Sequence, residues 1–287
     1  MELDLTLSLI EGLKDQSNPK VAIISKGSRA SGLGHIYRSI YIAKDLWRNG
    51  IKTVFNDMGG SASAVLIDLP GREETLEVLC SIPKSKFRVV FDNDGSLVDL
   101  DADILVYPDF LSVRGISFRA RKVLSGWNYI YPPLEIRLLK EASRSVGKDI
   151  LILFGGADPG GYTLAFLQYL LRRGIPSGVV FNVVFGPLNR DYYYLSKVFL
   201  PDSIKVWRAL RDISPLYASS FIVVSSGGLS FAYSVFLGKP TVGLPQSEME
   251  KRRISFYSGR SPLVKLAFSI EDAIDKVYSL IEDPYLR

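Results

Sequence analysis

The chain has 287 residues, of which 47% are hydrophobic, and a formal net charge of +5 at neutral pH. This length suits two α/β domains of about 130 residues each, with enough apolar residues for a sizeable core. The chain holds one histidine and one cysteine, which excludes an internal disulfide and argues against a metal site. No run of about 18 apolar residues occurs, so no membrane-spanning helix is expected.

Charge patterning favours a small-molecule partner. Two short basic clusters, at 119–122 and 251–253, lack the interleaved aromatic residues of a nucleic-acid motif, so no nucleic-acid partner is expected. A mild positive bias suits an anionic ligand such as a nucleotide diphosphate. Acidic Glu2 and Asp4 stand where a secretory signal would carry basic residues, which favours a cytoplasmic location. No cofactor is expected, and the oligomeric state stays open.

The first half of the chain follows a strand–loop–helix pattern. Residues 1–20 are expected to form an N-terminal arm, followed by a first domain over 21–140. An apolar strand at 21–24 leads into a glycine-rich stretch and then into a helix that stops at Asn49-Gly50. Further short apolar strands are expected at 53–55, 64–67, 87–91 and 104–107. Such alternation predicts βαβ units and a mostly parallel sheet.

The same pattern restarts in a second domain, expected over residues 147–287 after a charged linker. A strand at 150–154 leads into a glycine turn and a helix that stops at Gly174. A second glycine turn at 225–228 opens another helix, and a last helix begins at Ser269. Further strands are expected at 179–185, 221–224 and 242–244. The predicted fold class is therefore α/β, with two Rossmann-like domains facing each other across a cleft.

The most specific chemical signal is the Gly-Leu-Gly-His segment at 32–35, between the first strand and its helix. Gly32 and Gly34 would let backbone approach a ligand closely, and a helix N-terminus favours negative charge. His35 would lie in the first turn of that helix, where open α/β sheets bind ligands. An imidazole suits general-base chemistry on water or a hydroxyl. We predict His35 as the catalytic residue, the alternative being a polar residue with no chemical role.

Two further polar residues are candidates for substrate binding. Arg38 lies three residues after His35 on the same helical face and could orient an anionic group, or it could be a solvated helix residue. Asp92 follows a predicted strand in the segment Asp-Asn-Asp-Gly. It could bind sugar hydroxyls or a metal, and a plain Asx turn is the alternative interpretation.

The glycine turns of the second half are candidate phosphate-binding elements. Ser226, Gly227 and Gly228 precede a predicted helix, and successive N–H groups at a helix start can bind phosphate without a cation. Gly155 and Gly156 have the same double interpretation, as a ligand cradle or as a tight strand-to-helix turn.

Taken together, these segments resemble the PseG-type nucleotide-sugar hydrolases and SpsG-type proteins, which are similar in fold to MurG-like glycosyltransferases. The Gly-x-Gly-His-x-x-Arg loop matches at 32–38. Further matches in the family's order lie at 91–94, 102–108, 126–129, 154–159 and 225–240. The resemblance implies a GT-B-like fold, with the nucleotide held mainly by the C-terminal domain.

The same resemblance implies roles for individual residues. His35 maps onto the family's essential histidine, the diphosphate would lie against Gly227 and Gly228, and the base would be held by backbone near Ile213. One departure is Tyr233, which stands where the family usually has a ribose-binding Glu. A neutral phenol can accept a hydrogen bond but lacks a carboxylate's two-oxygen grip. The family's Asn-Gln pair after the last strand is also replaced, here by 246–248.

Three functions compete on these observations. The leading hypothesis is a hydrolase that cleaves the nucleotide from an activated amino sugar in surface-glycan biosynthesis, with His35 deprotonating water. The alternative is a GT-B glycosyltransferase in which an acceptor hydroxyl replaces water. The second alternative, favoured by Tyr233, is a non-catalytic homologue that binds a nucleotide sugar.

Overall fold

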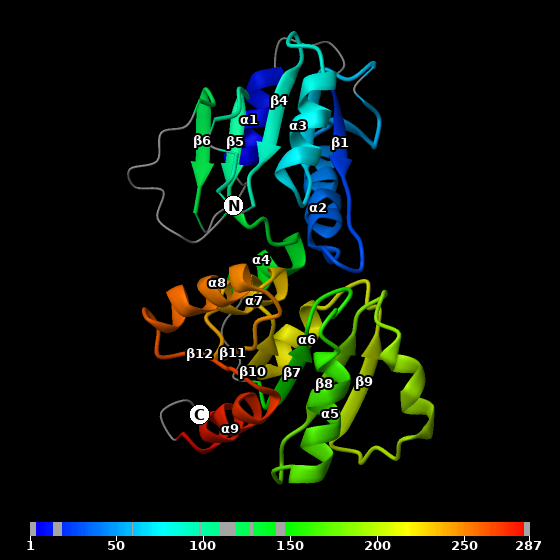
Figure 1. Ribbon diagram of the computed structural model, residues 1–287, viewed down its shortest axis with the longest axis vertical. Helices are drawn as coiled ribbons and strands as arrows, with labels where there is room; N and C mark the ends of the chain where they lie inside the picture. The colour runs from blue at the N-terminus through cyan, green and yellow to red at the C-terminus, as the bar shows by residue number, and fades with distance from the viewer. Residues whose placement is uncertain are drawn as a thin grey trace. The chain divides into compact units, whose positions relative to one another are not determined.

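A computed structural model describes residues 4–13, 19–58, 60–93, 95–97, 99–108, 119–126, 129–141 and 147–283. Within these ranges the chain divides into two compact units, the first drawn from 1–27 and 33–133 and the second from 28–32 and 134–287. Each unit is built on a six-stranded sheet (Figure 1). The α/β class and the mostly parallel sheets expected from the sequence are confirmed.

The first unit has the strand order β2-β1-β3-β4-β5-β6, with all neighbours parallel. Its strands are β1 (Lys20–Ser25), β2 (Lys52–Phe55), β3 (Ala64–Asp68), β4 (Phe87–Phe91), β5 (Ile104–Tyr107) and β6 (Lys122–Ser125). Its helices are α1 (Asp4–Leu13), α2 (Gly34–Arg48) and α3 (Arg72–Ser81). Because all strands run the same way, the loops that follow them meet at one edge of the sheet.

Alternate side chains of this sheet feed two cores on its opposite faces. On one face, Ile23 and Leu66 pack with Ile42 of α2, and on the other, Ile24 and Ile67 pack in the cluster of Leu79 from α3. All five residues of β3 are buried. A strand covered on both faces reads as a continuous apolar run instead of an alternating one, as residues 64–67 do.

Helix α1 lies within the segment expected to be an N-terminal arm. Its leucines Leu5, Leu9 and Leu13 recur every four residues and are at most 2% exposed. They belong to the same buried cluster as Val21 and Leu46. The described part of this segment is therefore an amphipathic helix that completes the core of the first unit, because a helical apolar stripe needs a partner surface.

The second unit has the strand order β12-β11-β10-β7-β8-β9, again all parallel. Its strands are β7 (Asp149–Leu153), β8 (Phe181–Phe185), β9 (Ile204–Arg208), β10 (Ser220–Ser225), β11 (Thr241–Gly243) and β12 (Val264–Leu266). Its helices are α4 (Leu134–Glu141), α5 (Tyr162–Arg173), the 3-10 helix η2 (Asp191–Lys197), α6 (Ser214–Ser219), α7 (Leu229–Phe236), α8 (Glu248–Ser258) and α9 (Ile270–Glu282). Helix α4 covers part of the region expected to be a linker.

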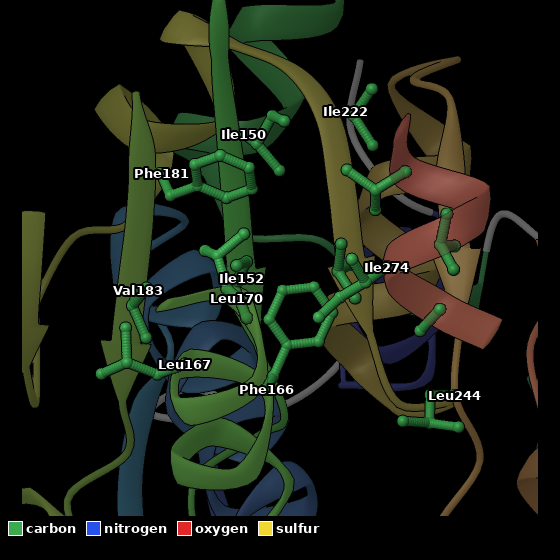
Figure 2. Close-up of a cluster of buried hydrophobic side chains, with 14 of the residues drawn as sticks. Ile150, Ile152, Phe166, Leu167, Leu170, Phe181, Val183, Ile222, Leu244 and Ile274 are labelled. Atoms are coloured by element: carbon green, nitrogen blue, oxygen red, sulfur yellow. The ribbon is translucent and has the colours of Figure 1, made fainter. Parts of the chain in front are cut away.

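The main core of the second unit lies between its sheet and helices α5 and α9. Figure 2 shows Phe166 and Leu170 of α5 and Ile274 of α9 against side chains of β7, β8 and β10. Two caps expected from the sequence hold these helices. Gly174 follows α5 with a φ of +94°, and the Ser269 hydroxyl accepts the backbone N–H of Asp272 at 3.1 Å.

Across the ranges that the structure describes, no helix combines the length and the apolar character needed to cross a membrane.

Candidate functional site

The sheet order of the first unit brings the start of α2 close to the end of β3. Strands β1 and β3 are neighbours, with Ser25 paired to Asp68. The loop after β1 turns at Gly32, whose φ of +75° suits glycine, and Gly34 is the first residue of α2. His35 therefore lies in the first turn of α2, at the edge of the sheet where Asp68 ends β3.

His35 forms a partly buried pair with Asp68. The Nδ1 atom of His35 is 2.8 Å from Oδ1 of Asp68, and the side chains are 15% and 0% exposed. Arg38, one turn further along α2, holds the same carboxylate with two bonds, from Nε to Oδ2 at 2.8 Å and from a terminal nitrogen to Oδ1 at 2.5 Å. The Arg38 guanidinium also lies 4.4 Å from the ring centre of Phe91.

Asn93 completes this cluster from the loop after β4. Its side-chain oxygen accepts a hydrogen bond from Arg38 at 2.7 Å. Its amide nitrogen lies 3.3 Å from Oδ1 of Asp68 and 3.4 Å from the carbonyl of Leu69. Three side chains, from α2 and from the loop after β4, thus converge on the carboxylate at the end of β3.

The electrostatics of the cluster determine which nitrogen of His35 carries the proton. Burial alone raises the pKa of Asp68, but the adjacent Arg38 charge and the hydrogen bonds from His35 and Arg38 outweigh it and hold the pKa well below its usual range. An ionised carboxylate only accepts hydrogen bonds, so Nδ1 of His35 must donate. The other ring nitrogen, Nε2, then holds the lone pair of the neutral imidazole and can take a proton.

Arg38 and Asp92, the two candidate substrate-binding side chains, both bind groups of the protein itself. Arg38 is 4% exposed, and its guanidinium binds the internal carboxylate of Asp68, so it orients the His35 partner. Asp92 is fully buried and accepts the backbone N–H groups of Gly95, Ser96 and Leu97 at 2.8–3.2 Å. It forms the Asx turn that was the alternative interpretation. Asp94, Trp127 and Asn128 of the resemblance motifs lie outside the described residues.

The glycine turn after β10 is in close contact with helix α8. Ser226 is 4% exposed, and Gly228 precedes the first residue of α7. A Cβ placed on Gly227 would lie only 2.6 Å from the Cβ of Glu250. Any residue other than glycine at position 227 would therefore collide with α8. The Glu250 carboxylate accepts the backbone N–H of Gln246 at 2.7 Å.

The glycine loop after β7 is packed against the loop after β8. The carbonyl of Gly156 accepts the backbone N–H of Leu188 at 3.0 Å, and Gly155 has a φ of +84° with open space where a side chain would begin. In the same loop, Asp158 accepts the backbone N–H groups of Tyr162 and Thr163 at 3.0 and 2.8 Å. Asp158 thus anchors the start of α5, in keeping with a structural role.

Tyr233 and Ile213 are the two other residues to which the resemblance gave a role in nucleotide binding. Tyr233 is 5% exposed, so its side chain is packed inside the second unit. The carbonyl of Ile213 accepts the backbone N–H groups of Leu216 and Tyr217 at 3.1 and 3.2 Å in the first turn of α6. The hydrogen-bonding capacity of this carbonyl is therefore partly used within α6.

A pocket of about 310 Å³ opens after strands β11 and β12, with Gln246 and Phe268 among its lining residues. The turn residues 226–228 and His35 are not among them. Considering only the residues that the structure describes, no group of three or more His, Cys, Asp and Glu side chains could hold a metal ion.

Sequence reasoning missed Asp68, Asn93 and Glu250. Asp68 immediately follows the apolar run at 64–67, and an acid at the carboxyl end of a parallel strand is a signal that could have found it. Asn93 lay inside a segment that was singled out for Asp92. Glu250 comes after the strand expected at 242–244 and lies 22 residues after Gly228. No local sequence pattern therefore connects Glu250 with the glycine turn.

Comparison with known proteins identifies the fold but not the function. No family model matches the chain. An uncharacterized protein of Methanocaldococcus jannaschii is 28% identical across 81% of this chain, and the chain spans 57% of that relative's length.

Solved glycosyltransferases of the GT-B fold are similar to this chain over more than nine tenths of its length. The spinosyn rhamnosyltransferase SpnG with thymidine diphosphate has a TM-score of 0.56 at 12% identity, with 92% of each chain covered. MurG of Acinetobacter baumannii has a TM-score of 0.52 at 11% identity, covering 93% of this chain and 92% of that one. UGT89C1 of Arabidopsis thaliana with UDP has a TM-score of 0.61 at 10% identity, covering 94% and 92%. At these identities the similarity establishes a GT-B-like fold.

Proposed function

We propose that this protein is a glycosyltransferase that uses a nucleotide-sugar donor, with His35 as the general base. The observation that carries the proposal is the pairing of His35 with Asp68, which leaves Nε2 as the proton acceptor at a ligand-binding edge of the first sheet. The fold supports the donor class, because the similar structures include glycosyltransferases described with UDP and thymidine diphosphate.

The proposed reaction needs one proton acceptor and one stabilised leaving group. Nε2 of His35 takes the proton of an acceptor hydroxyl, and the oxygen attacks the anomeric carbon of the donor sugar. The bond from that carbon to the diphosphate oxygen breaks, and the nucleoside diphosphate leaves with the electron pair. N–H groups near Gly227 and Gly228 are the proposed donors to the departing charge, a preorganised electrostatic role.

Asp68 acts in this scheme as a positioning residue. It fixes the ring and the Nδ1–H tautomer of His35, as the aspartate does in a Ser-His-Asp triad. Arg38 and Asn93 in turn hold Asp68 from its other sides. The buried carboxylate therefore stays ionised and in place while His35 gains and loses a proton.

Hydrolysis is the second candidate, favoured by the Gly-x-Gly-His-x-x-Arg segment at 32–38 that resembles the PseG-type hydrolases. Water would replace the acceptor hydroxyl, and the role of His35 would be the same. The two reactions differ in their products, because hydrolysis releases nucleoside diphosphate and free sugar without any acceptor.

The test is nucleotide release from a panel of UDP-sugars and TDP-sugars, with and without hydroxyl acceptors, by the parent protein and by His35→Asn. Asparagine keeps a polar side chain but has no comparable basic nitrogen. Loss of a general base lowers a rate by about a hundred- to ten-thousand-fold, so we expect a loss of that size. Binding of UDP, followed by calorimetry, should be unchanged.

Tyr37→Phe is the matched control, since it changes the same turn of α2 without touching the Asp68 cluster. Equal turnover by His35→Asn and the parent would refute the assignment of His35. Release that does not depend on an acceptor would favour hydrolysis over transfer.

A further inference from the structure

The glycine turn of the second unit already holds a negatively charged side chain. The carboxylate of Glu250 accepts the backbone N–H of Gln246 at 2.7 Å, and its Oε1 atom would lie 3.6 Å from a Cβ on Gly228. The backbone N–H of Gly227 and the hydroxyl of Ser226 lie near enough to lower the pKa of this carboxyl. Gly227 and Ser226 are among the groups that a phosphate at the start of α7 would use. In this structure the protein's own carboxylate lies beside them.

The packing of α8 against the turn holds Glu250 in this contact. The Cα and Cβ atoms of Glu250 would lie 2.8 and 2.6 Å from a Cβ on Gly227, so the helix backbone itself is held against the turn. Ser247 caps α8 by accepting the backbone N–H of Glu250 at 3.2 Å. The position of Glu250 is therefore fixed by its helix as well as by its side-chain bonds.

The charges around the turn are balanced. Arg253, on the same helix, donates a hydrogen bond to the carbonyl of Gly227 at 2.6 Å. Among the described residues, it is the charged group that acts on the Glu250 carboxyl, and the groups facing Glu250 from other elements are neutral donors. Glu250 and Arg253 together contribute no net charge to the turn.

We infer that Glu250 is a specificity-determining residue whose carboxylate occupies the anion site of the turn and weakens the binding of a nucleoside diphosphate until it is displaced or neutralised. This inference rests on the proposed function, in that it takes the turn at 226–228 as the nucleotide-binding element. The inference adds that the diphosphate of the donor must compete with the Glu250 carboxylate. The sequence of the glycine turn alone does not reveal this competition.

Protonation is a second way to remove the negative charge of Glu250. Burial raises the pKa of the Glu250 carboxyl above its usual range, against the lowering effect of its hydrogen bonds and of Arg253. A raised pKa means that the carboxyl takes up a proton at a higher pH than an ordinary glutamate does. Diphosphate binding to the parent protein should therefore tighten as the pH falls.

The experiment is calorimetric titration of UDP into the full chain of the parent, Glu250→Gln and Glu248→Gln, at about pH 8 and about pH 5.5. Glutamine has nearly the same shape as glutamate and keeps one acceptor oxygen, but it removes the charge and leaves Arg253 uncompensated. Two unit charges a few ångströms apart interact strongly enough near a protein surface that we expect UDP to bind at least about tenfold more tightly to Glu250→Gln at the higher pH.

Glu248→Gln is the matched control, because it makes the same chemical change on the same helix at a side chain that is 84% exposed. We expect its UDP affinity to equal that of the parent. The difference in UDP affinity between the parent and Glu250→Gln should be smaller at the lower pH than at the higher pH. The ionisation of UDP itself is the same in all three titrations and cancels in the comparison.

Failure of this inference can be told apart from failure of the proposed function. If Glu250→Gln binds UDP no more tightly than the parent at the higher pH, the inference is overturned, whatever His35→Asn does to turnover. If Glu250→Gln gains UDP affinity but no nucleotide sugar is turned over, the inference stands and the proposed reaction falls. Glu250→Ala, checked for folding by thermal unfolding, should bind UDP at least as well as Glu250→Gln, because it also empties the turn.

Discussion

Replacing Asp68 by asparagine should destabilise the first unit strongly, although the two side chains have the same shape. Oδ1 of Asp68 accepts from His35 and Arg38, and Oδ2 accepts from Nε of Arg38. An asparagine amide has one acceptor oxygen and one NH₂ group. Whichever way the amide is turned, its NH₂ group faces an N–H donor, and the buried Arg38 loses its counter-charge.

The size of the effect follows from the burial of the pair. The side chains of Arg38 and Asp68 are 5% and 0% exposed. Removing one partner of a buried ion pair costs about 3–5 kcal/mol, because the remaining charge is left uncompensated. For a chain of this size, each kcal/mol lowers the melting temperature by about 2–4 °C. We therefore expect a loss of about 6–20 °C.

The assay is thermal and urea unfolding of the full chain, followed by circular dichroism, with Asp99→Asn as the control. Asp99 forms a similar two-bond pair with Arg72, at 2.9 and 3.0 Å, but its side chain is 58% exposed. Water replaces lost bonds at such a site, so little change is expected. If Asp68→Asn were as stable as Asp99→Asn, the argument that Asp68 compensates a buried charge would be wrong.

The pH dependence of the same variant gives an independent check. The pKa of Asp68 is lowered in the folded protein, so the unfolded chain binds the proton more readily and stability rises with pH across this window. The contribution of Asp68 is complete above the usual aspartate pKa of about 3.9 and is lost as the pH falls below it. The acid-induced loss of stability should therefore be shallower in Asp68→Asn than in the parent.

Two further substitutions test the packing of the second unit. Gly186→Ala should lower the free energy of urea unfolding by about 1–3 kcal/mol, because a Cβ there would lie 2.4 Å from the carbonyl oxygens of Gly155 and Gly156. Gly60→Ala, with open space around the new methyl group, is its control, and equal stability of the two variants would contradict the packing argument. Tyr233→Glu should lower the melting temperature far more than Tyr233→Phe, since the site is 5% exposed and burying a lone carboxylate costs several kcal/mol. A Glu variant as stable as the parent, with tighter UDP binding, would restore the ribose-binding role expected from the sequence.

The main architecture was predictable because apolar runs and glycine turns are local signals. The expected strands at 64–67 and 87–91 correspond to β3 and β4, and the two-sheet α/β fold agrees with the solved glycosyltransferase structures. Strands β6, β9 and β12 were missed, since each carries polar residues among its few apolar ones. Helix α1 was missed because the turn-like residues that follow it favoured an N-terminal arm, although the four-residue spacing of its leucines indicates a helix.

The candidate site was predictable only in part, because its geometry depends on strand order. His35 stood out as the single histidine beside two glycines. Its partner Asp68 is 33 residues away in the chain and comes into contact because β3 lies beside β1. The role of Arg38 could not be read from its position on the helix, since the carboxylate it binds comes from another strand. These contacts are set by tertiary packing, which a single sequence does not specify.

The order of strands in the two sheets has a consequence for how this protein behaves at high concentration. The outermost strands are β2 and β6 in one sheet and β12 and β9 in the other. Each of them carries a lysine, Lys52, Lys122, Lys265 and Lys205 respectively. An outer strand offers backbone groups to which another chain could add a strand, and a lysine opposes such an addition because its charge would have to leave water. The four lysines therefore oppose strand addition, and with it amyloid-like association, at the outermost strands of both sheets.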